Sequence, residues 1–161
     1  MKLAETYKFV PVASDMDVSG SATNPCDSIN MKKYHHATFV VNLQTLGGAD
    51  LHCKVYSGAT DAALTSALTF RYAFASAAAG SANCDVLAAA TTSADLTIAH
   101  ATYDNYMLVI EVDASDMDLA NGENWLTLSF PDDETGSTGN LSAVAILVPR
   151  YTSDLSATAL T

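Results

Sequence analysis

Hydrophobic and polar residues alternate with a period of two along most of this chain, which is the pattern of β-strands. The clearest case is residues 35–44, where one face carries Ala37, Phe39, Val41 and Leu43. The same alternation recurs in residues 51–56, 70–74, 96–98, 106–113 and 126–130. Each of these segments is therefore predicted to be a half-buried strand.

Two further segments are predicted to be strands of a different kind. Residues 141–150 are apolar on both faces, which indicates a central place in a sheet or contact with a partner. Residues 6–13 contain Pro11, which lacks the N–H donor that a sheet ladder needs. This second strand is predicted to lie at a sheet edge or in an extended arm.

Connections between the strands follow from turn-forming residues. Gly47-Gly48 separates residues 35–44 from 51–56 and predicts a hairpin. Helical signals are weak: residues 61–68 are predicted to form one or two turns, and residues 115–118 a turn or single 3₁₀ turn. Residues 75–90 are rich in Ala, Ser and Gly and predict a long loop with a short element at 86–89.

About eight strands separated by turn signals predict an all-β fold, an antiparallel β-sandwich of jelly-roll-like form. We expect three parts. Residues 1–13 are an N-terminal arm or edge strand, residues 14–151 a single sandwich domain, and residues 152–161 a C-terminal tail without a core pattern.

Composition adds constraints on partners. The 161 residues suit one domain, 49% of them are hydrophobic, only 16% are charged, and the net charge is −11. That apolar content excludes an acidic disordered chain, and seven basic residues are too few for nucleic acid. No secretory signal and no membrane span is expected. A surface so poor in charge predicts cover by other protein, although an ordinary Ala-rich soluble monomer has the same composition.

The residues that usually carry chemistry do not form a recognisable active site. Cys26, Cys53 and Cys84 have no metal-binding or disulfide spacing and are predicted to be free thiols. The four histidines lie on segments expected to be apart, and no serine stands in a G-x-S-x-G elbow. We therefore expect no enzyme activity and no cofactor.

Two acidic clusters are the remaining candidates for an ion site. The first is Asp113, Asp116 and Asp118, and the second is Asp132, Asp133 and Glu134. Carboxylates in a tight turn suit Ca²⁺, but the spacing is not that of an EF-hand loop, and Asp is also a common turn residue. Solvated turns and a weak calcium site are the two alternatives.

Three segments in order resemble small head proteins of tailed bacteriophages. They are Asp27 to Val40 (DSINMKKYHHATFV), Asp104 to Ala114 (DNYMLVIEVDA) and Ser142 to Tyr151 (SAVAILVPRY). The resemblance spans Asp27 to Tyr151 and is least good over residues 58–94. It implies a capsid decoration, or cement, protein: a β-sandwich that binds the outer face of the shell built by the major capsid protein.

The resemblance also implies a homo-oligomer, often a trimer, made in the bacterial host cytoplasm and carried on the virion. It implies no catalytic residues, and the acidic charge suits the side of a shell away from DNA. The residues expected to meet partners are Leu3, Tyr7, Phe9 and Val10 in the arm, with Arg150 and Tyr151 at the start of the tail. Frayed termini are the alternative for both segments.

A carbohydrate-binding jelly roll used for adhesion is the alternative function. Sugar sites often stack exposed aromatic rings on the sugar, and Trp125, Tyr103 and Tyr106 lie near expected loops. Rings at alternating strand positions also suit a core.

Overall fold

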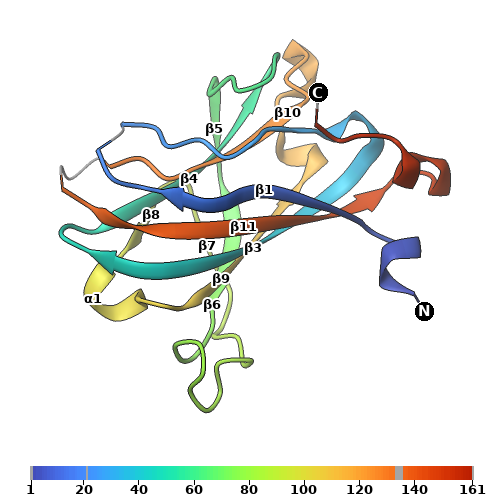
Figure 1. Cartoon of the computed structure of the whole chain (residues 1–161). Coiled ribbons are helices and arrows are strands. Elements are labelled where there is room, and N and C mark those ends of the chain that lie inside the picture. The colour runs from blue at the N-terminus through green and yellow to red at the C-terminus, as the bar shows by residue number, and fades with distance from the viewer. Residues whose placement is uncertain (1, 21, 133–135, 161) are drawn as a thin grey trace.

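The computed structural model describes residues 2–20, 22–132 and 136–160, and it is an antiparallel β-sandwich, as predicted. The six-stranded sheet has the order β1-β11-β3-β9-β6-β7, and the five-stranded sheet consists of β2-β10-β4-β5 with β8 also paired to β4. Figure 1 shows the two sheets as layers facing each other. No helix in the described ranges is long and apolar enough to cross a membrane.

The strands of the six-stranded sheet are β1 (Lys8–Asp17), β3 (Tyr34–Gly47), β6 (Phe70–Phe74), β7 (Thr91–Ser93), β9 (Met107–Asp113) and β11 (Thr138–Pro149). Those of the other sheet are β2 (Ile29–Asn30), β4 (Leu51–Gly58), β5 (Ser66–Leu68), β8 (Leu96–Ile98) and β10 (Trp125–Ser129). The short helical elements are η1 (Leu3–Glu5), η2 (Met31–Lys33), α1 (His100–Tyr103), η3 (Ala114–Asp116), η4 (Leu119–Asn121) and η5 (Thr152–Ser156).

The core lies between the sheets and is built from the predicted inward faces. Phe39, Val41 and Leu43 of β3 are completely buried, as are Leu108 and Ile110 of β9. Burial of such side chains is the main driving force of folding. The strand orders β1-β11-β3-β9 in one sheet and β2-β10-β4-β5 in the other are jelly-roll-like.

The two unusual strands take the places expected of them. β11 pairs with β1 on one side and β3 on the other, so the strand with two apolar faces is central. Among the strands of the described residues, β1 pairs with β11 alone, so it forms an edge where the missing N–H of Pro11 is tolerated. β1 continues to Asp17, beyond the boundary predicted after residue 13, so the predicted arm and the predicted domain share this strand.

The predicted hairpin is wrong. β3 and β4 belong to different sheets, and the Gly47-Gly48 connection carries the chain from one layer to the other. Gly48 has a φ of +74°, and a Cβ there would lie 1.9 Å from the carbonyl oxygen of Gly136. These glycines therefore permit a tight corner between sheets, which has the same local sequence requirement as a hairpin turn.

The predicted helix at residues 61–68 is also wrong, because Ser66–Leu68 forms β5 on the edge of β4. Pairing of Leu68 with Val55 buries Leu68, and this tertiary contact outweighs a weak helix propensity. Other predictions are confirmed: residues 114–116 form the 3₁₀ turn η3, and residues 75–90 form a loop that projects beyond the sheets (Figure 1, green). Within residues 86–89 the loop forms an isolated bridge between Leu87 and Ala75.

Candidate functional site

The arm residues predicted to meet partners differ in their exposure. Leu3 in η1 is 51% exposed and Phe9 in β1 is 40% exposed, whereas Tyr7 is half-buried. Val10 is only 3% exposed and packs in the core. The side chains available to a partner at this edge are therefore those of Leu3 and Phe9, with part of Tyr7.

The C-terminal end of β11, where the two predicted C-terminal contacts follow, lies at the same end of the molecule as the N-terminus (Figure 1). Arg150 is exposed and Tyr151 is 72% exposed. The tail that follows folds back on the sandwich: Lys8 Nζ donates to the Leu155 carbonyl at 3.1 Å, and Ala159 is buried. The two predicted contact segments are thus brought together.

The outward side of the six-stranded sheet carries a continuous line of apolar side chains. Strand register aligns one residue from each of five strands, and we call this set the apolar row: Pro11, Val144, Val40, Val109 and Ala73. Val144 is 37% exposed and Val40 and Val109 are half-buried, whereas Ala73 at the β6 end is only 8% exposed. Strands with one solvated face normally place polar residues there, so the row is an unusual feature of a free surface.

More apolar surface adjoins this row on the β1 and β11 side. Phe9 pairs with Ile146 two residues along from the Pro11–Val144 pair, and Val148 follows on the same face of β11. At the other end, Leu87 of the projecting loop is exposed beside Ala73 and Val109, and together they line a cavity of about 310 Å³. The apolar surface therefore extends from one edge of the sheet to the base of the loop.

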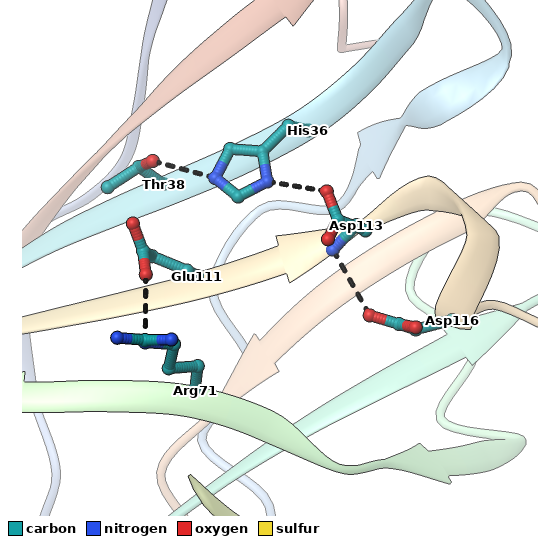
Figure 2. Close-up of polar contacts among 6 residues, drawn as sticks. All are labelled: His36, Thr38, Arg71, Glu111, Asp113 and Asp116. Atoms are coloured by element: carbon teal, nitrogen blue, oxygen red, sulfur yellow. Dashed lines mark hydrogen bonds and ion pairs between the residues drawn. The ribbon is translucent and has the colours of Figure 1, made fainter. Parts of the chain in front are cut away.

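Polar side chains lie beside the apolar row, toward the C-terminal end of β9. Figure 2 shows their contacts with one another. His36 Nδ1 lies 2.8 Å from Asp113 Oδ1, and His36 Nε2 lies 3.2 Å from Thr38 Oγ1. Arg71 Nε lies 3.6 Å from Glu111 Oε2. Exposed ion pairs of this kind add little to the stability of the fold. These residues form a polar rim beside the apolar row, and such a rim can orient a binding partner.

The histidines show a regularity that the sequence did not reveal. His36 lies beside Asp113, and the other two pairs are His52 with Asp95 at 2.8 Å and His100 with Asp50 at 2.9 Å. Each pair joins residues more than 40 positions apart, so no local spacing announces it. Throughout the described ranges, no group of three or more His, Cys, Asp or Glu side chains is placed to hold a metal ion.

The three carboxylates proposed as weak calcium ligands have separate structural tasks. Asp113 bonds His36, and Asp116 Oδ2 accepts from the Asp113 backbone N–H at 3.4 Å. Asp118 caps η4, where both its oxygens accept from Asn121. These are the roles of turn carboxylates.

In the second acidic cluster, Asp132 closes the following turn. It accepts from the Gly136 and Ser137 backbone N–H groups and from the Ser137 hydroxyl, the last at 2.6 Å. These bonds lower the pKa of the Asp132 carboxyl, and the bond from the Ser137 hydroxyl has the largest effect. Asp133 and Glu134 lie outside the described residues.

The three cysteines are free thiols, as predicted. Cys26 and Cys53 are buried, and burial raises the pKa of the Cys26 thiol to about 12. Burial likewise raises the pKa of Cys53. Both thiols are thus held in the protonated, unreactive form.

The aromatic residues of the carbohydrate alternative lie in two places. Trp125 is largely buried in β10. Tyr103, the last residue of α1, and Tyr106 are half-buried and contact each other edge to face, at the wall of a cavity of about 540 Å³. The structure thus brings two of the three together.

The chain is an antiparallel β-sandwich whose six-stranded sheet carries the apolar row on its outer side. Comparison with known proteins adds little to this classification. No protein-family model matches it, and no curated protein matches its sequence. Among solved structures it is similar to the SPBc2 prophage-derived protein YomS, with a TM-score of 0.46 and 9% identity over 88% of this chain and 92% of that one.

Two viral structures are also similar. The Tobacco streak virus coat protein has a TM-score of 0.36 and 13% identity over 93% of this chain and 91% of that one. A chain of the T13 IBDV viral particle has a TM-score of 0.23 and 12% identity over 89% of this chain and 39% of that one. At these scores the likenesses establish neither a family nor a function.

Proposed function

We propose that this chain is a structural protein of a phage virion, which binds the outer surface of the capsid and stabilises it by bridging subunits of the major capsid protein. It acts as a homo-oligomer, expected to be a trimer, and performs no catalysis. The observation that carries the proposal is the apolar row across the outer face of the six-stranded sheet.

The apolar row suits a protein partner because of its composition and its border. Val40, Val144 and Val109 lie side by side on three neighbouring strands with no charged side chain between them. Interface cores are poor in charge and are surrounded by polar residues, which here include His36 and Arg71. Covering Val144 and its neighbours would remove their apolar area from water and favour binding.

The segments that resemble phage head proteins supply the middle of this face. Residues 27–40 lead into β3, residues 104–114 contain β9, and residues 142–151 contain most of β11. These three strands are adjacent in the order β11-β3-β9. The sequence segments that suggest a head protein thus build the surface that we propose for docking.

Charge and copy number support the same proposal. A net charge of −11 disfavours contact with packaged DNA and suits the outer side of a shell. A subunit of this size makes a modest contact by itself. Several linked copies on a repeating lattice gain strength by multivalency, which would hold neighbouring capsomers together.

The test uses empty capsids of the phage that encodes the chain. The wild-type protein should co-sediment with these capsids and raise the temperature at which they disrupt. Val144→Lys should weaken binding by about tenfold or more, because a lysine within the apolar row would be buried in the complex without a partner charge. Val144 is exposed enough for the lysine to reach water in the free protein.

Ala67→Lys is the matched control, because Ala67 is exposed on β5 in the opposite sheet. It should bind like the wild type. Failure of the wild-type protein to bind capsids would contradict the proposed function. Equal binding by Val144→Lys and Ala67→Lys would contradict the assignment of the docking face.

A further inference from the structure

A second surface feature, separate from the apolar row, is the cavity of about 540 Å³ near α1. Residues of β6, β7 and β8 line it together with Thr102, Tyr103 and Tyr106. β7 and β8 are only three residues long each, so they cover only a small part of this side of the sandwich. Its volume is within the range of small-ligand sites.

Aromatic rings form a connected series along one wall of this cavity. Phe74 stacks on Tyr103 with ring centroids 3.8 Å apart, and Tyr103 meets Tyr106 edge to face at 5.5 Å. Tyr72 contacts Phe74 edge to face at 5.9 Å. Mutual packing fixes the orientation of these rings, so their side chains would lose little conformational entropy when a ligand binds.

Hydroxyl groups supply the polar part of the lining, and no lining side chain is charged. They belong to Tyr72, Tyr103, Tyr106, Ser76, Thr91, Thr97 and Thr102. Within the described ranges none of these hydroxyls has a hydrogen-bond partner in the protein, and none is buried without one, so they remain open to solvent. Each can both donate and accept.

We propose that this cavity binds a neutral saccharide. The C–H faces of a sugar ring pack on aromatic rings, and its hydroxyls match the tyrosine and threonine hydroxyls. Acidic glycans and phosphorylated ligands are disfavoured, since the lining offers no cation and the molecule carries a net charge of −11. This binding activity goes beyond capsid attachment and does not depend on it.

The test is a titration of the ¹⁵N-labelled full chain with maltohexaose, xylohexaose and lacto-N-tetraose, after a glycan array has extended the search to other neutral sugars. Colominic acid serves as the acidic comparison. At least one neutral glycan should shift amide signals of residues 72–76, 91, 97 and 102–106, and colominic acid should shift none. Absence of binding by every neutral glycan would overturn the proposal, as would shifts confined to another surface.

Variants then test whether the rings and hydroxyls bind. Tyr106→Ala should weaken binding about tenfold through loss of the ring face, and Tyr106→Phe less so, through loss of the hydroxyl alone. Thr91→Val removes one exposed hydroxyl with little change in volume and should also weaken binding. Tyr151→Ala, at an exposed residue that does not line the cavity, is the control and should bind like the wild type.

Unchanged affinity in both Tyr106→Phe and Thr91→Val would overturn the role of the cavity, and neither of these variants removes buried apolar volume. The outcome is independent of the capsid experiment. A protein that binds sugar but no capsid contradicts only the proposed function, and a protein that binds capsid but no sugar contradicts only this inference.

Discussion

At the scale of single residues, Glu123 is the side chain whose burial most needs an explanation. It is 5% exposed, and no ion pair to it is found in the described part of the chain. Instead, Oε2 accepts from the Ser57 hydroxyl at 2.6 Å and Oε1 from the Ser66 hydroxyl at 3.1 Å. The carboxylate thereby ties the loop before β10 to both β4 and β5.

Replacing Glu123 by alanine should lower the free energy of unfolding by about 2 kcal/mol, because the buried Ser57 hydroxyl would lose its acceptor. Glu123→Gln retains one acceptor oxygen and should lose less. Urea denaturation measures both. Glu5→Ala removes an exposed carboxylate and should change stability by only a few tenths of a kcal/mol. Equal stabilities for Glu123→Ala and Glu5→Ala would contradict this role.

At the scale of elements, aspartates hold the connections between strands and make the fold sensitive to acid. Hydrogen bonds from the His100 side chain and backbone lower the pKa of Asp50, which joins the start of β4 to α1. The Ser137 hydroxyl does the same for Asp132. A carboxyl with a lowered pKa in the folded state stabilises the fold above its unfolded pKa, and that contribution is lost as pH falls through the folded value.

The melting temperature should therefore decrease when the pH is lowered below about 4, which is the usual pKa of an unfolded aspartate. Asp50→Asn and Asp132→Asn should melt lower than the wild type at pH 6. The difference should shrink at pH 3, because the stabilisation declines as the pH falls from the unfolded pKa toward the lowered folded pKa. Thermal unfolding followed by circular dichroism measures this. Asp85→Asn, in the exposed loop, is the control. A difference for Asp132→Asn that is as large at pH 3 as at pH 6 would contradict the expected linkage.

Much of the element structure could be predicted, because a strand with one buried face shows alternation locally. The faces of β3 and the central place of β11 both follow from residue patterns. The corner at Gly47-Gly48 could not be separated from a hairpin, since both need the same permissive backbone. β5 was missed because three residues carry too little pattern, and its pairing with β4 is what holds it.

The candidate surfaces were less predictable than the strands. Val40, Val109 and Val144 are each unremarkable on their own strand, and only the register of three distant segments makes them a row. The cavity likewise joins β6 to α1 across about 30 positions of sequence, where Phe74 meets Tyr103. Contacts between distant segments depend on topology, which residue periodicity does not specify.

At the scale of the whole molecule, the exposed edge of the six-stranded sheet bears on assembly. β1 has a neighbour on one side only, and Phe9 and Leu3 expose apolar side chains there. Such an edge can accept a strand or an apolar surface from another chain. A second copy of this chain placed at that edge would leave the centre of the apolar row free for the capsid.

The proposed trimer predicts a mass three times 16.9 kDa for the purified protein in analytical ultracentrifugation. Phe9→Ser should shift the population toward monomer, because Phe9 is 40% exposed at this edge and its loss removes apolar area from the edge contact. Val86→Ser, in the projecting loop and also half exposed, should remain trimeric. A monomer at all concentrations would contradict the trimer, while trimers in both variants would place the contact elsewhere. Because several linked copies bind a lattice more tightly than one, Phe9→Ser should also release capsids faster than Val86→Ser, although both retain the apolar row.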